Sequence, residues 1–183
     1  PLPRRGGPFR VEPDRQTPSG IATGERGADS LTDSRFWPAL DIASDDNAPW
    51  VMAEFHEPTS VSSVRVGLPV RHGFGTPPAP RARLEASVDG VSFDLVAELP
   101  ASASPVRSAS FPAVTARSFR LVLESGDSPS FPIAPGIKPL PFTASSSTPI
   151  FKVSAFQLFS GARVTRSEEK AGYAPVPDYY ALD

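Results

Sequence analysis

Hydrophobic and polar residues alternate in several short stretches of this chain, as they do in β-strands that bury one face. The alternation predicts strands at 50–55 and 61–68, joined by a tight turn at 56–59. In the second of these strands, Val64 and Val66 alternate with polar neighbours. We therefore expect a β-hairpin in this region, with Trp50 opening its first strand as a core residue.

The same alternation predicts most of the remaining strands, and Gly, Pro or Ser separates one from the next. Asp89-Gly90 is a turn signal typical of hairpins, and the apolar residues on both faces of 150–159 predict a central strand. A short helix is expected after Ser167, which is a favourable N-cap residue. The further predicted strands are 21–23, 81–88 with its apolar face ending at Val88, 91–99, 106–111 and 117–124. Strands joined by short connections predict an antiparallel all-β domain.

Composition adds long loops to this picture. The 183 residues suit one domain, and 23 of them are proline, more than twice the average usage of about 5%. Proline disfavours helix interiors and central strands. Two stretches, 28–49 and 125–149, are therefore expected to be long loops. Leu31, Trp37 and Ile42 are expected to pin the first loop to the body of the domain.

Charge and cysteine content narrow the function classes. The net charge is −2, with both signs mixed along the chain, which argues against nucleic acid or an anionic membrane as a partner. No apolar run approaches the 18 residues of a membrane-spanning helix. The absence of cysteine excludes disulfides and cysteine-based metal or redox sites, and it leaves the compartment open. Because the sequence does not begin with Met, we expect a piece of a longer chain.

Catalytic chemistry has no clear place in the sequence, so no catalytic residue is assigned. The acidic residues, including Glu54 and Glu85, fall mostly on outward strand positions and are expected to be solvated. His56 and His72 lie apart in predicted turns, which disfavours a histidine metal site. Neither a nucleophile elbow nor a phosphate-binding loop is present.

The arrangement of several motifs resembles the galactose-binding-like (discoidin, coagulation factor 5/8 type C) β-sandwich. The most specific motif is L-x-x-S-x-D-G-x-x-F, at 84–93, and the likeness covers roughly 19–160. The other motifs lie at 31–37, 49–66, 116–121 and 152–159. This resemblance implies an antiparallel jelly-roll β-sandwich with long Pro-rich loops. Residues 1–18, rich in Pro and Arg and without periodicity, are expected to form an extended arm or linker, and 161–183 a docking or linker segment.

The resemblance also implies a place for sugar binding. Carbohydrate modules of this fold use loops at one end of the sandwich, where an aromatic ring meets the apolar face of a pyranose and Arg, Asp or His binds its hydroxyl groups. The candidates are Arg35, Trp37 and Asp41 in the first loop, and Arg71, His72 and Phe74 in the second. The alternative is that Trp37 and Phe74 pack in the core or between domains.

Calcium is a further expectation. The density of carboxylates in 28–49 suggests Ca²⁺, which takes several oxygen ligands; the alternative is a solvated loop with Asx-turns. In the family that this chain resembles, an acid in this loop helps to hold Ca²⁺, and Asp33 matches that position. A glutamate in the last strand is the second family ligand, and Ala155 stands in its place.

The C-terminal segment, 161–183, resembles part of a narrower group of proteins. Motifs at 161–164, 169–173 and 178–180 resemble the segment that joins such a sandwich to the catalytic region in large bacterial α-L-rhamnosidase-like glycoside hydrolases. This implies an accessory module whose partner is a catalytic domain of the same polypeptide, acting on plant or bacterial polysaccharide in the periplasm or outside the cell. The alternative is a stand-alone carbohydrate-binding or adhesion module. Residues expected to dock onto the partner are Phe131, Ile133, Ile137, Leu140, Phe142, Tyr173, Tyr179 and Tyr180.

Overall fold

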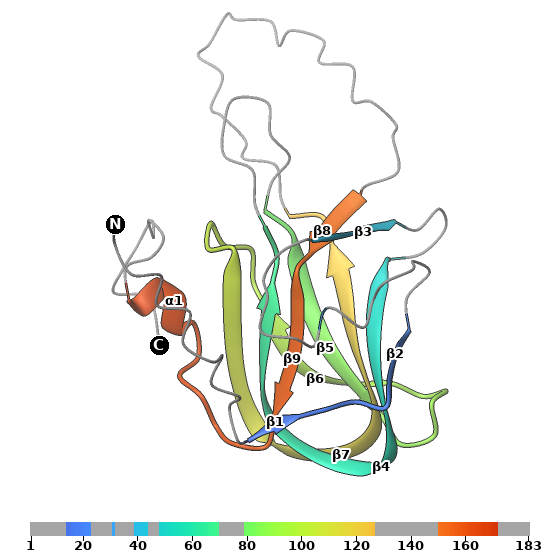
Figure 1. The fold of residues 1–183 in the computed structure, drawn as a ribbon. Helices are drawn as coiled ribbons and strands as arrows, with labels where there is room; N and C mark the ends of the chain where they lie inside the picture. Colours follow the sequence, from blue (N-terminus) through green and yellow to red (C-terminus); the bar gives the residue numbers. More distant parts are fainter. Residues whose placement is uncertain are drawn as a thin grey trace, which may run out of the picture.

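A computed structural model describes residues 14–22, 31, 39–43, 48–69, 79–126 and 150–171 (Figure 1). Its elements are β1 (Arg15–Gln16), β2 (Gly20–Ala22), β3 (Leu40–Ala43), β4 (Trp50–Gly67), β5 (Arg81–Ser87), β6 (Asp94–Leu99), β7 (Val106–Glu124), β8 (Ile150–Val153), β9 (Ala155–Phe159) and α1 (Ser167–Lys170). The strand pairs are antiparallel, as expected. Within the described ranges, no helix is long and apolar enough to cross a membrane.

β4 and β7 are each one long bent strand, and this corrects the predicted hairpin. They pair with each other along almost their whole lengths, with register shifts between Glu54 and Thr59 and between Val61 and Ser63. Such irregularities let a strand bend. The residues expected to form tight turns therefore lie side by side where both strands curve (Figure 1). We call this bend, residues 54–61 and 110–118, the corner.

Two prolines explain why the sequence suggested turns at the corner. Pro58 falls in the first register shift of β4, and Pro112 of β7 falls opposite the second shift. A proline cannot donate a ladder hydrogen bond, so it is tolerated in a strand where the ladder is interrupted. The prolines therefore bend two paired strands and do not reverse either of them.

The bend divides the structure into two layers around one core. The strand order is β1-β9-β4-β7-β5-β6, with β2 also paired to β4. The core is formed by side chains that face inward from both halves of the long strands and from β5 and β9. Its largest fully buried members include Leu84, Phe119, Leu121, Phe156 and Leu158. An antiparallel β-sandwich is confirmed.

Trp50 does not belong to this core. Val51, Ala53 and Phe55 are the core-facing residues of the first half of β4. Because side chains alternate along a strand, Trp50 lies on the opposite face, where it is half-buried beside its register partner Val122. The expectation of a core tryptophan was wrong.

Residues 28–49 were expected to form a loop, but they contain the strand β3. β3 pairs with β8, and Leu31 and Ile42 are buried in the core, as expected for residues that pin this stretch. The predicted strand 150–159 is interrupted at Ser154. β9 then runs between β1 and β4, and all five of its residues are buried, which confirms a central strand.

The segment after β9 is fastened to the outer face of the layer that contains β9. Serine side chains of β4 and β7 bind its backbone: Ser62 Oγ donates to Ser160 O at 2.6 Å, Ser63 Oγ donates to Gly161 O at 2.6 Å, and Ser108 Oγ donates to Val164 O at 3.1 Å. Serine suits these positions because it is small enough to let another backbone approach and still supplies a hydrogen bond. Residues 160–167 are thereby held against the sandwich.

The other end of the described chain is tied to the same place. The Arg163 guanidinium lies 3.7 Å from the centre of the Phe159 ring and 3.0 Å from the Asp14 carboxylate. Ser160 N also donates to Asp14 O at 3.0 Å. A Cβ atom at Gly161 would lie 2.6 Å from Asp14 Oδ2, so a larger residue here would displace the Asp14 carboxylate from its present position.

Candidate functional site

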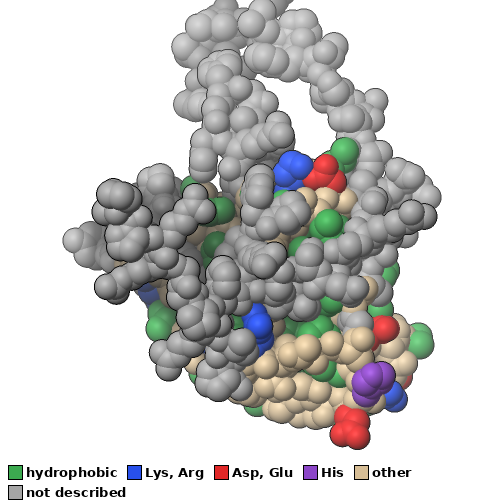
Figure 2. All heavy atoms as spheres, viewed as in Figure 1, with side chains coloured by type: hydrophobic (Ala, Val, Ile, Leu, Met, Phe, Trp, Pro, Cys, Tyr) green, Lys and Arg blue, Asp and Glu red, His purple; other side chains and the backbone are tan. Residues whose placement is uncertain are grey.

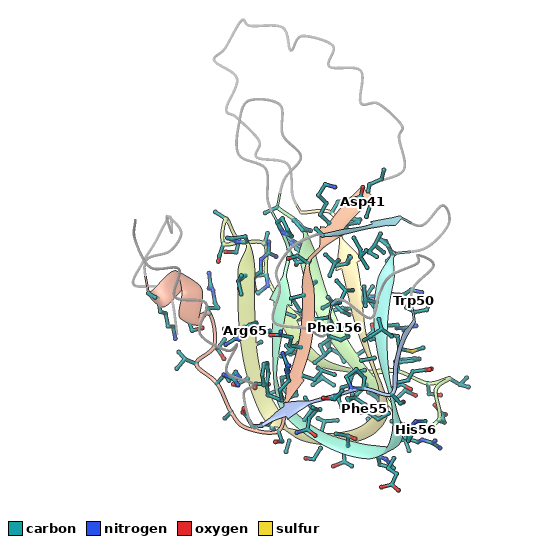
Figure 3. The ribbon with its side chains drawn as sticks, in the orientation of Figure 1. Asp41, Trp50, Phe55, His56, Arg65 and Phe156 are labelled. Atoms are coloured by element: carbon teal, nitrogen blue, oxygen red, sulfur yellow. The ribbon has the colours of Figure 1, made fainter. Side chains whose placement is uncertain are left out.

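Asp41 is the member of the predicted sugar-binding set that lies among the described residues. It is exposed on β3 and forms an ion pair with Lys152, its register partner on β8. Figure 3 places it at the end of the molecule opposite His56. The predicted residues outside the described ranges are Arg35, Trp37, Arg71, His72, Phe74, Asp33, Phe131, Ile133, Ile137, Leu140, Phe142, Tyr173, Tyr179 and Tyr180. Their roles stay predictions.

A hollow of about 480 Å³ lies at the corner, where the start of β2, both long strands and the β5–β6 loop meet. Its lining combines two carboxylates, a guanidinium and an imidazole with apolar surface. Figure 2 shows the histidine with acidic and basic side chains around it at this end. The charged, aromatic and aliphatic residues of the lining are Glu54, Phe55, His56, Val88, Asp89 and Arg117.

Hydrogen bonds to the backbone carbonyls of β4 fix the frame of this corner hollow. Arg117 Nη2 donates to His56 O at 2.9 Å across the two strands. Ser19 N and Oγ both donate to Glu54 O, at 2.7 and 2.8 Å. Below them, the buried ring of Phe55 meets Phe119 edge-on, with centroids 6.0 Å apart and an interplanar angle of 88°. The hydrogen bonds and this core contact hold β4 in place next to the hollow.

The loop at Ser87–Ser92 forms one wall of the hollow. Asp89 Oδ1 accepts hydrogen bonds from Val91 N, Ser92 N and Ser87 Oγ, each at 2.8 Å. Gly90 has φ 77°, a conformation that favours glycine. Asp89-Gly90 is thus a turn, as expected. However, β5 ends at Ser87 and the turn leaves Val88 exposed, so the predicted burial of Val88 was wrong.

The Asp89 carboxyl is expected to titrate well below an ordinary aspartate. Hydrogen bonds from Val91 N, Ser92 N and Ser87 Oγ favour the charged form and lower its pKa from 3.8 to about 2. Since the folded-state pKa is the lower one, the ionised carboxylate stabilises the fold above pH 3.8, and this stabilisation is lost as the pH falls towards 2. Carboxyl resonances followed by NMR between pH 1.5 and 6 should show this midpoint.

A matched pair of variants tests the cause of this shift. Ser87→Ala removes one donor to Asp89 and should raise the titration midpoint of Asp89. Ser125→Ala, at the residue directly after β7, should leave this midpoint unchanged. A wild-type midpoint near 3.8 would contradict the hydrogen-bonded turn.

Glu85 is a buried carboxylate, contrary to the expectation of a solvated position. Its Oε1 lies 2.7 Å from Arg83 Nε, and its Oε2 lies 2.6 Å from Arg120 Nη2 on the neighbouring strand. Arg120 also stacks 3.9 Å from the centre of the Phe93 ring. Burial alone would raise the pKa of Glu85, but the hydrogen bonds and charges of both arginines together hold this pKa below its ordinary value. Glu85 therefore links β5 to β7.

Metal binding finds no support in the described part of the chain, where no group of three His, Cys, Asp or Glu side chains could hold an ion. Ala155, at the family's second calcium position, is fully buried and supplies no side-chain oxygen. Asp33 lies outside the described residues, so calcium stays a prediction. The hollow presents hydrogen-bond donors and acceptors beside the exposed apolar side chain of Val88, a combination that suits recognition of a polar molecule.

No protein-family model matches the chain, and no curated protein matches it. Solved structures do match. A rhamnosidase from Novosphingobium sp. PP1Y has 29% identity and a TM-score of 0.61, over 84% of this chain and 12% of its own. The CBM32 module of AlyQ, in complex with 4,5-unsaturated mannuronic acid, has 14% identity and a TM-score of 0.55, over 80% of this chain and 98% of its own.

A pectin-binding carbohydrate-binding module is similar over 80% of this chain and 94% of its own length, with 13% identity and a TM-score of 0.52. These modules correspond to the sandwich over nearly their whole length. The chain therefore has the galactose-binding-like β-sandwich fold, which confirms the expected fold. It spans only 12% of the rhamnosidase.

Proposed function

We propose that this chain is a noncatalytic, carbohydrate-binding accessory module of a larger, α-L-rhamnosidase-like glycoside hydrolase. The observation that carries the proposal is the match to a rhamnosidase at 29% identity, over 84% of this chain but 12% of that one. On this proposal the catalytic carboxylates belong to a neighbouring domain of the same polypeptide. The module then positions polysaccharide or supports that domain.

The chemistry of the buried carboxylate supports a noncatalytic role. Glycoside hydrolysis uses a carboxylic acid whose raised pKa keeps it protonated, opposite a second carboxylate. Glu85 has the opposite character, since Arg83 and Arg120 occupy both of its oxygens and its pKa is lowered. Its interactions suit a structural bridge.

The fastened segment after β9 supports a module that is attached to a neighbouring domain. Because residues 160–167 are bound to the sandwich through Ser62, Ser63 and Ser108, the chain leaves the sandwich in a defined direction. The docking residues predicted in 125–149 and in the tyrosine-rich tail would then meet the partner. A stand-alone carbohydrate-binding or adhesion module is the second candidate, favoured by the modules that match over nearly their whole length.

Calorimetry and an activity assay on the purified chain test this proposal together. Titration with rhamnose-containing, galactose-containing and pectic oligosaccharides should give heat with at least one of them, and aryl rhamnosides should not be hydrolysed. Turnover by the pure chain would contradict a noncatalytic role, and absence of heat with every sugar would contradict carbohydrate binding. If the predicted loops bind the sugar, Trp37→Ala should remove the part of the heat that these loops contribute, and Trp37→Phe should retain some of that part.

A further inference from the structure

The corner hollow lies at the opposite end of the sandwich from Asp41, the described member of the predicted sugar-binding set, as the positions of His56 and Asp41 show (Figure 3). We propose that the hollow is a separate binding site for one neutral sugar residue, whose hydroxyl groups bind Glu54, Asp89 and Arg117. The inference rests on the proposed carbohydrate-binding function, to which it adds a location and a sugar class.

The size and lining of the hollow suit a sugar ring. Its volume of about 480 Å³ falls within the range of roughly 300–1,000 Å³ found for small-molecule sites. A hydroxyl group both donates and accepts hydrogen bonds, and the lining has acceptors in Glu54 and Asp89 and donors in Arg117. Val88, 65% exposed, supplies apolar surface for the C–H groups of the ring.

The backbone around the site is held in place before any ligand arrives. Hydrogen bonds from Arg117 and Ser19 hold the backbone of β4 at His56 and Glu54, and the Asp89 turn is held by its own donors. Ordering loops and side chains is a main cost of binding, and preorganisation reduces that cost. The Glu54 carboxylate and the His56 ring make no hydrogen bond or ion pair with another described residue, so both can turn to a ligand.

Charge favours a neutral sugar over an acidic one. The hollow contains the carboxylates of Glu54 and Asp89 against one guanidinium, that of Arg117. The Asp89 carboxylate is ionised across the physiological range, as an aspartate already is at its ordinary pKa of 3.8, and the hydrogen bonds of its turn lower that pKa further. A uronic acid would bring a third negative charge into this hollow and would be repelled, whereas a neutral sugar meets acceptors without repulsion.

NMR titration of the ¹⁵N-labelled full chain tests both the location and the sugar class. L-Rhamnose and D-galactose should shift the amide signals of Glu54, His56 and Arg117, with dissociation constants in the range of roughly 1–10 mM. D-Galacturonate should bind at least about fivefold more weakly than D-galactose, its neutral counterpart. This preference should shrink at high salt, because ions screen exposed charges.

Matched variants separate the hollow from the rest of the surface. Glu54→Gln should weaken D-galactose binding about fivefold. It should also reduce the preference of the hollow for D-galactose over D-galacturonate, because one negative charge is removed. Glu57→Gln makes the same change on the same strand outside the hollow lining and should have no effect. Trp37→Ala, in the predicted loop, should leave the shifts at the hollow intact.

Three results would overturn this inference: no shifts at the hollow with any of the three sugars, equal binding of D-galacturonate and D-galactose, or equal effects of Glu54→Gln and Glu57→Gln. Sugar binding that Trp37→Ala alone abolishes would also overturn it, while leaving the proposed function intact. Failure of every oligosaccharide in calorimetry would instead contradict the proposed function itself.

Discussion

Replacement of Arg107 by alanine should lower the free energy of unfolding by about 2–4 kcal/mol. Arg107 is 5% exposed near the start of β7, and its register partner Val66 belongs to the core. Its guanidinium donates to Pro80 O at 2.5 Å, Pro100 O at 3.2 Å and Ser102 O at 3.0 Å. One side chain thus fastens the segments before β5 and after β6 to β7, and its loss would leave these carbonyls without that donor.

Urea unfolding followed by circular dichroism measures this loss. Arg107→Lys retains the charge but cannot reproduce the planar fork of donors, so it should lose roughly half as much stability as Arg107→Ala. Arg81→Ala removes an exposed arginine from the start of β5 and should cost less than about 1 kcal/mol. Equal effects of the Arg107 and Arg81 alanine variants would show that the three carbonyl contacts contribute little.

The fold class was predictable because it depends on local patterns. The alternation in 81–87 determines which face of β5 is buried, and Asp89-Gly90 marks the turn that follows β5. The hairpin prediction failed because turn residues look alike in a reversal and in a bend. Only the pairing of β4 with β7 along both halves, a contact between segments about 50 residues apart, decides between the two.

The corner hollow could not be predicted from local patterns for a related reason. It is assembled from single residues of segments distant in sequence, such as Ser19, Glu54, Asp89 and Arg117, and each of these residues alone is typical of a solvated surface. Glu85 was missed in the same way, because one of its two arginine partners, Arg120, comes from another strand. Strand register, which single-sequence patterns do not determine, brings these side chains together.

Replacement of Phe119 by alanine should be the most destabilising single change on the core side of the corner. Phe119 is fully buried on β7 between its register partners Ala53 and Ala86, and it contacts Phe55 edge-on. Removing a buried phenylalanine costs about 3–5 kcal/mol, because apolar contacts are lost and a cavity remains. Two small alanine neighbours leave little side chain to fill that cavity, so the cost should lie in the upper part of this range.

Phe119→Leu keeps the chain folded for measurement and connects this core contact to the corner hollow. It should cost less than about 2 kcal/mol, while Val91→Ala, at a side chain 82% exposed, should cost less than about 0.5 kcal/mol. Because Phe55 is among the residues that line the hollow, Phe119→Leu should also weaken D-galactose binding there without changing any charge. Urea unfolding and the NMR titration report the two effects separately. If D-galactose shifts the amide signals of Glu54 and His56 as much in a folded Phe119→Leu variant as in the wild type, the hollow does not depend on the Phe55–Phe119 pair.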